Sequence, residues 1–171
     1  SGTYVVIDVM HFSTTVVELL GNGAASVHVP TERGREFDFR DRNPTAVLGG
    51  PKTADYEPET GYDFINSPSH VQDLPVTGRP VSFTSTNGGR SVADLRERGG
   101  EDVNVYVGTT TNAATLGRHL QGSEEDIYLV SAGTDGRRAR EDHLGAALLT
   151  RYLQDDPPTP ARLADYRERL R

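Results

Sequence analysis

The chain has 171 residues, of which 35% are hydrophobic, with 18 glycines, 10 prolines and no cysteine. This length favours one domain that folds without metal or disulfide staples, and the lack of cysteine excludes a thiol nucleophile, a zinc ribbon and a disulfide framework. The formal net charge of −7 argues against general nucleic-acid binding, which relies on a basic surface.

Membrane segments are not indicated by the sequence. No apolar run approaches the roughly 18 residues that a membrane-spanning helix needs, and the chain does not open with a basic and apolar leader. We therefore expect a cytoplasmic protein with no membrane partner.

Short apolar runs alternate with helix-like stretches along the chain. The apolar runs predict strands at 4–9, 26–29, 46–48, 81–84, 103–107 and 127–131. The periodic stretches predict helices at 14–20, 32–40, 89–98, 113–120 and 141–153, followed by a linker and a terminal helix from residue 160. Residues 51–74 show no regular pattern and are expected to form a functional or mobile loop. This alternation indicates an α/β fold with a mostly parallel sheet between helical layers.

Four of these strands run into loops rich in Ser, Thr, Asn or Gly at the start of the next helix. The loops are 13–15, 84–89, 108–112 and 131–136. Helix starts offer unpaired N–H groups and a favourable dipole, and ligands of parallel sheets bind beyond the carboxyl ends of the strands. The four loops therefore predict one binding site for a small anion such as a phosphate ester.

Asp8 is an acid at the end of an apolar strand, where an ionised carboxylate needs a cation or several donors. A magnesium ligand is the favoured interpretation, and a cap for the helix that starts near Ser13 is the alternative. The hydroxyls of Ser13, Thr14 and Thr15 stand at the same helix start, and they can bond either to the backbone or to a phosphate.

The loop from Thr84 to Arg90 is the most specific of the four. Its two glycines allow close approach of the backbone to a ligand, and its hydroxyls, its Asn amide and the Arg90 guanidinium supply donors. A well-capped helix is the alternative.

Glu141 and Asp142 follow the glycine-rich loop and three arginines. Acids at a helix start suit the helix dipole in any protein, but here they also suit a divalent cation shared with a phosphate. The five histidines show no metal-binding spacing, although His11 lies in the first polar loop, where a general acid would be useful.

Several anion-binding motifs are absent. The sequence has no P-loop, no GxGxxG after the first strand and no GxSxG elbow. An aspartate-nucleophile phosphatase would carry a second Asp at position 10, which is Met10 here.

The ordered motifs resemble those of the 2-phosphosulfolactate phosphatase (ComB) family over residues 4–150. They are Val6-Ile7-Asp8-Val9 with Ser13-Thr14-Thr15, Leu48-Gly49-Gly50, Asp63-Phe64-Ile65-Asn66-Ser67-Pro68, Thr84-Ser85-Thr86-Asn87-Gly88-Gly89-Arg90, and Ala132-Gly133-Thr134-Asp135-Gly136-Arg137 before Glu141-Asp142. The resemblance implies a three-layer α/β/α fold in a single ComB-like domain over 1–171 that lacks part of the family's C-terminal region. It also implies a cytoplasmic hydrolase of coenzyme M biosynthesis.

The activity implied by the resemblance is magnesium-dependent removal of phosphate from (2R)-phosphosulfolactate or a related small phosphorylated 2-hydroxy acid. The implied catalytic and Mg²⁺-binding residues are Asp8, Glu141 and Asp142. The expected substrate-binding residues are Ser13, Thr14, Asn66, Ser67, Thr86, Asn87, Gly88, Arg90 and Arg137. A homodimer is compatible with the sequence.

Two departures from the family pattern bear on function. His11 and Phe12 stand where the family run has Arg and Ala, and Pro51-Lys52 stands where a Glu-Arg pair is usual. These changes predict altered recognition of the substrate. The alternative function is a non-catalytic anion-binding or scaffold protein on the same fold.

Overall fold

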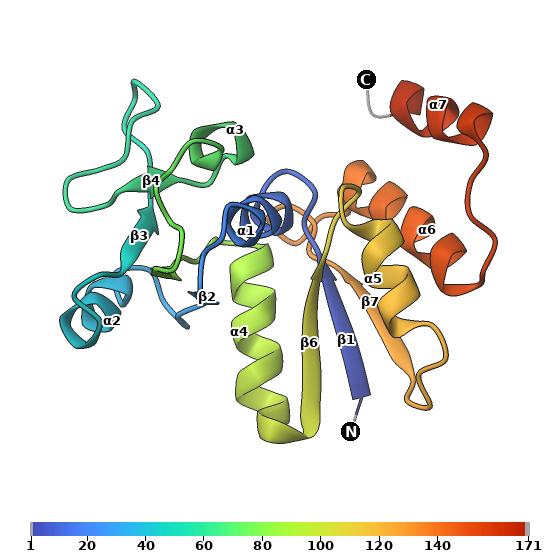
Figure 1. The fold of residues 1–171 in the computed structure, drawn as a ribbon, viewed down its shortest axis with the longest axis horizontal. Helices are drawn as coiled ribbons and strands as arrows, with labels where there is room; N and C mark the ends of the chain where they lie inside the picture. The colour runs from blue at the N-terminus through green and yellow to red at the C-terminus, as the bar shows by residue number, and fades with distance from the viewer. Residues whose placement is uncertain (1, 170–171) are drawn as a thin grey trace.

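The computed structural model describes residues 2–169, whose strands form two parallel sheets (Figure 1). The first sheet has the order β6-β1-β7 and consists of β1 (Gly2–Ile7), β6 (Val103–Gly108) and β7 (Ile127–Ser131). The second has the order β2-β5-β3-β4 and consists of β2 (Ser26–His28), β3 (Val47–Gly50), β4 (Phe64–Ile65) and β5 (Pro80–Ser82).

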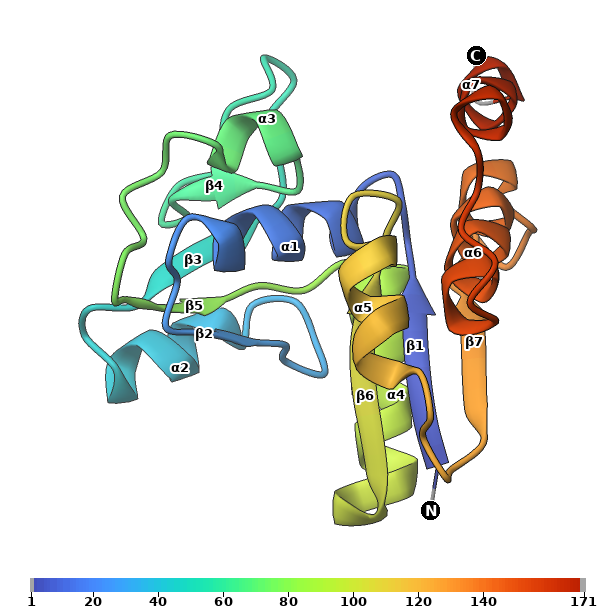
Figure 2. The same cartoon turned by 45° about the vertical axis from the view of Figure 1, so that its right-hand side comes forward.

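Helices cover both faces of the first sheet. On one face lie α1 (Phe12–Gly21) and α4 (Gly88–Gly99), and on the other lie α5 (Ala113–Leu120) and α6 (Arg140–Leu153). Figures 1 and 2 show that α1 lies between the two sheets, in agreement with its contacts to both β6 and β2.

The remaining helices are shorter or peripheral. The second sheet is packed against α2 (Glu36–Arg42), while α3 (Pro68–Val71) contacts β4 and α1. A 3₁₀ turn (Gly100–Asp102) leads into β6, and α7 (Pro160–Arg169) follows α6 near the described end of the chain (Figure 1).

Burial on both faces explains why β1 reads as a continuous apolar run. Val6 belongs to the cluster under α1 and α4, whereas Val5 and Ile7 belong to the cluster under α5 and α6. All three side chains are fully buried, as expected where successive residues of a strand point to opposite covered faces.

The predicted α/β/α class is confirmed, and each predicted strand and helix overlaps an observed one. Two features were not predicted. The strands divide between two sheets, and the patternless segment 51–74 contains β4 and α3. Both elements are too short to show a periodicity, because β4 has two residues and α3 has four. Within residues 2–169, no helix is long and apolar enough to cross a membrane.

Candidate active site

Three of the four polar loops leave the first sheet at one edge. The last residue of β1, Ile7, lies in register with Gly108 of β6 and Ser131 of β7. The loops also touch, because the Thr14 and Thr109 hydroxyls are 2.7 Å apart. The parallel register therefore gathers these loops around Asp8, as proposed from the order of strands and helices.

Asp8 joins this cluster to the fourth loop. Its carboxylate Oδ2 accepts a hydrogen bond of 2.9 Å from the N–H of Gly88, at the start of α4. Only 6% of Asp8 is exposed, and no ion pair in the described residues neutralises it. Burial raises the pKa of Asp8 to about 6, with a further upward contribution from the nearby Asp142. The protein thus buries a carboxylate that is short of positive charge.

Asp142 ties two of the loops to each other. One carboxylate oxygen accepts from the Val9 N–H at 2.8 Å and the other from the Gly133 N–H at 2.9 Å. Burial raises its pKa, since only 1% of the residue is exposed. Glu141, half-buried in the first turn of α6, raises the Asp142 pKa further.

Gly88 must be a glycine to hold this geometry. A Cβ at this position would lie 2.7 Å from Asp8 Oδ2 and 2.7 Å from Phe12 Cδ1. The close approach of α4 to Asp8 therefore depends on the missing side chain.

The loop before α4 is held by its own side chains. The Ser85 hydroxyl accepts from the Gly89 N–H at 2.9 Å, and Asn87 Oδ1 accepts from the Asp135 N–H at 3.3 Å. Thr86 is exposed and makes no hydrogen bond within residues 2–169. Arg90 is 75% exposed and forms only a loose 3.9 Å pair with Asp94, so both residues are accessible to a ligand.

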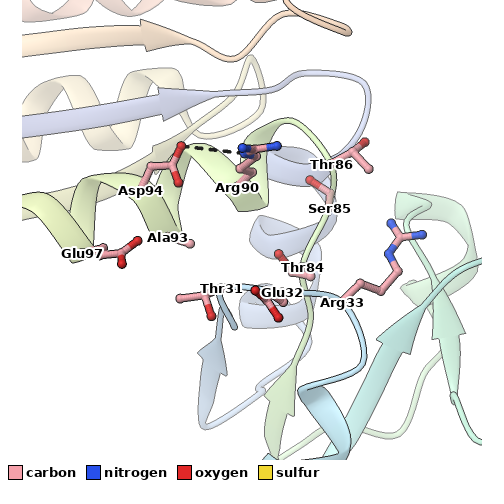
Figure 3. Close-up of a pocket in the computed structure, with 10 residues that line it drawn as sticks. All are labelled: Thr31, Glu32, Arg33, Thr84, Ser85, Thr86, Arg90, Ala93, Asp94 and Glu97. Carbon is pink, nitrogen blue, oxygen red and sulfur yellow. Dashed lines mark ion pairs between the residues drawn. The ribbon is translucent and has the colours of Figure 1, made fainter.

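Ser85, Thr86, Arg90 and Asp94 line a pocket of about 520 Å³, shown in Figure 3. Thr84, Ser85, Thr86 and Arg90 form one side, and the segment 31–33 forms the other. A second pocket of about 470 Å³ contains His11, Asn66 and Ser67. Arg33 lines both pockets.

The two predicted residues from segment 51–74 lie in the second pocket. Asn66 Oδ1 accepts a 2.9 Å bond from the Thr15 hydroxyl, which fixes it to α1. Ser67 shares a 3.0 Å hydrogen bond with Ser69 and is half-buried. Segment 51–74 thus brings Asn66 to the helix that follows Asp8 and Ser67 to the same pocket.

Ser13, Thr14 and Arg137 stay predictions as substrate-binding residues, and none of them lines either pocket. Ser13 is fully buried, and its hydroxyl accepts from the Asp8 N–H and donates to the Val6 carbonyl, so it supports the loop. Thr14 donates inward to the Val9 carbonyl. Arg137 is exposed beside His143, in a separate pocket of about 180 Å³.

The predicted Mg²⁺ site stays a prediction. Residues 2–169 contain no group of three or more His, Asp or Glu side chains that could hold a metal ion. Asp142 is enclosed and uses both carboxylate oxygens on backbone amides, which argues against its role as a ligand. Asp8 has the properties of a donor, because Mg²⁺ often takes one or two carboxylates and completes its shell with water and substrate phosphate.

Sequence reasoning missed Arg33 and did not assign Lys52 to the site. Both line the second pocket. Lys52 carried a signal that could have been used, since it is the only lysine in the chain. Arg33 carried no such signal in the sequence, because its position beside the loops follows from the packing of the second sheet.

A family model and several relatives of this chain carry the same family name. The model of the family described as 2-phosphosulpholactate phosphatase matches residues 1–167. A protein of Symbiobacterium thermophilum named "Probable 2-phosphosulfolactate phosphatase" is 34% identical, with 94% of this chain and 67% of that protein covered. Proteins with the same name from Thermotoga petrophila and Deinococcus radiodurans are 32% and 34% identical, covering 95% and 86% of this chain and 68% and 60% of their own lengths. The chain thus spans about two thirds of the length of these relatives.

Proposed function

The chain belongs to the 2-phosphosulpholactate phosphatase family, a family of phosphoric monoester hydrolases, and from this premise we propose that it hydrolyses a small phosphorylated 2-hydroxy acid in a magnesium-dependent reaction. (2R)-Phosphosulfolactate, or a closely related ester, is the proposed substrate. The proposal includes the place in coenzyme M biosynthesis and the cytoplasmic location expected from the sequence.

The observation that carries this proposal is the buried carboxylate of Asp8, which lies beside the start of α4. An acid held 2.9 Å from a helix N-terminal N–H, with a pKa raised to about 6, needs a cation beside it at neutral pH. A phosphate ester brought by a divalent cation meets that need. The phosphate oxygens would also lie at the N-terminus of α4, where the helix dipole favours negative charge.

The residues around Asp8 suit phosphoryl transfer to water. We assign the phosphate oxygens to three donors around the start of α4, namely the exposed Thr86, the half-buried Asn87 amide and the exposed Arg90, which would stabilise the charge of the transition state. Water attacks phosphorus and gives a proton to the phosphate that is released, while the ester P–O bond breaks and the leaving oxygen takes up a proton. His11 is the proposed donor, since it stands at the N-cap of α1, in the loop that follows Asp8, and lines the second pocket.

Asp8 is the residue proposed to hold Mg²⁺, with Glu141 as the second candidate. The metal would polarise the phosphate and neutralise developing charge when bound. Asp142 is assigned the task of positioning, because its two hydrogen bonds fix the loops after β1 and β7 around Asp8.

The test is release of inorganic phosphate with and without Mg²⁺ from a panel of phosphorylated hydroxy acids. We expect Asp8→Asn to reduce release at least about 100-fold, because it retains the shape and the Gly88 contact but removes the charge. Asp38→Asn, an exposed acid paired with Arg35 at 3.3 Å, is the matched control and should leave release unchanged. Full turnover by Asp8→Asn would refute the role of Asp8.

A non-catalytic anion-binding protein is the second candidate. The absence of a three-residue metal cluster in the described part of the chain favours it. It predicts that phosphorylated hydroxy acids raise the melting temperature while no member of the panel releases phosphate.

A further inference from the structure

The second pocket is cationic, although the chain as a whole is acidic. Its lining includes Arg33, Lys52 and His11 and contains no carboxylate, whereas the formal net charge of the chain is −7. The pocket beside the loop before α4, by contrast, includes Glu32, Asp94 and Glu97 (Figure 3). The second pocket therefore has the stronger preference for anions.

The two permanent cations of this pocket are not neutralised by an ion pair, although the charge of Arg33 partly offsets the rise that burial causes in the pKa of Glu36. Neither Arg33 nor Lys52 forms an ion pair or donates a side-chain hydrogen bond within residues 2–169. Lys52 Nζ lies 3.6 Å from the centroid of the Tyr56 ring, which restrains the ammonium without neutralising it. In Figure 3 the Arg33 side chain extends away from Asp94 and Glu97.

The pocket adjoins the proposed phosphate site. Arg33 lines both pockets, and His11, which lines the second, stands at the N-cap of α1 in the loop that follows Asp8. On the opposite side, Asn66 is fixed to α1 by the Thr15 hydroxyl at 2.9 Å. A molecule with its phosphate at the loop before α4 could therefore extend its other groups toward Lys52.

We propose that this pocket binds the acid groups of the substrate other than phosphate, a carboxylate together with a second carboxylate or a sulfonate, through Arg33 and Lys52. This assignment rests on the proposed function and deepens it. Two unpaired cations match two acid groups, and Asn66 and Ser67 add polar contacts. Selectivity for a substrate with two acid groups over one with a single acid group follows from this charge count.

Binding of the dephosphorylated acids tests the pocket without any turnover. Isothermal titration calorimetry of the full chain would compare sulfolactate, which has two acid groups, with lactate, which has one. We expect sulfolactate to bind at least about tenfold more tightly, and Lys52→Gln and Arg33→Gln each to remove most of that preference. Arg35→Gln is the matched control, since Arg35 is paired with Asp38 and does not line the pocket.

Kinetics supply the second measurement. Lys52→Gln should raise KM for phosphosulfolactate about tenfold with little change in kcat, and leave KM for 2-phospholactate nearly unchanged. Equal binding of lactate and sulfolactate, or equal losses for both esters, would overturn the proposal. Preferential sulfolactate binding without phosphate release would support this pocket and refute only the hydrolase assignment.

Discussion

Asp8 shows at the scale of one residue how the site is maintained at the expense of stability. The carboxylate is buried and receives a backbone donor from Gly88, but burial outweighs that hydrogen bond and raises its pKa to about 6. An ionised Asp8 therefore destabilises the folded chain unless a cation lies beside it. Sites that bind charged ligands commonly keep such strain.

The stability of the metal-free protein should reflect this cost. The folded protein holds the Asp8 proton up to a pH of about 6, whereas the unfolded chain releases it near 3.8. The contribution of Asp8 to stability is therefore fully present below the unfolded pKa and is lost as pH rises through about 6. Integrated over that interval, the difference is about 3 kcal/mol.

Asp8→Asn should remove this dependence. The neutral amide avoids the burial cost, so in EDTA the variant is expected to exceed the wild type in free energy of unfolding at pH 8 by up to about 3 kcal/mol, and to match it below pH 3.8. Urea unfolding at several pH values measures the difference. Because Asp142 and Glu36 also have raised pKa values, only the difference between the two proteins reports on Asp8. A constant difference across this range would contradict the assignment.

At the scale of elements, the end of β3 depends on glycines that allow aromatic rings to pack over it. A Cβ on Gly49 would lie 2.4 Å from the Phe64 ring and 2.6 Å from the Phe83 ring. The absence of a side chain at Gly49 therefore allows the aromatic rings to contact the backbone of the strand. Gly50 is packed in the same way against Tyr62, at 2.2 Å.

Gly49→Ala should accordingly destabilise the fold. The added methyl group has no space between two buried rings, and overpacking of this kind typically costs about 1–3 kcal/mol. Gly21→Ala is the control, because Gly21 ends α1 and no atom lies within 4 Å of its added Cβ, so its effect should stay within about 0.5 kcal/mol. Thermal unfolding followed by circular dichroism compares the two. Equal melting temperatures would show that the rings move aside.

At the scale of the whole molecule, one apolar cluster joins the two sheets. Val6 of β1 and Val47 of β3 belong to it, together with Phe12, Phe64 and Phe83. The Phe83 ring lies 5.2 Å from that of Phe12 and 5.3 Å from that of Phe64, so it connects α1 to the second sheet. A shared core predicts that both sheets unfold together.

Phe83→Ala should therefore weaken the entire fold. Loss of a fully buried aromatic ring is expected to lower the free energy of unfolding by about 3–5 kcal/mol. Phe37→Ala is the control, because Phe37 is 37% exposed on α2, and about 1 kcal/mol is expected. Urea unfolding read both by tyrosine fluorescence and by circular dichroism should give one coincident transition. Two separate transitions would refute a single domain and leave the sheets as independent units.

The sequence by itself determined the α/β class and the parallel first sheet. A strand buried on both faces must be continuously apolar, and alternation of such strands with periodic helices admits few topologies. The sequence also predicts a ligand-binding loop from Thr84 to Arg90, because glycines allow close approach of the backbone and short polar side chains supply donors. The structure places the start of α4, which follows this loop, beside Asp8, and the ligand-binding role of the loop stays a prediction.

Only the tertiary structure decided which polar groups remain available to a ligand and which are used by the fold. The hydroxyl of Ser13 and the carboxylate of Asp142 are suited to binding a substrate or a metal ion. In the folded chain, however, their oxygens form internal hydrogen bonds. Arg33 and Lys52 lie 19 positions apart and meet at one pocket because the second sheet packs α2 and β3 side by side. Hydrogen-bond partners and pocket walls are set by contacts between distant segments, and no local pattern encodes them.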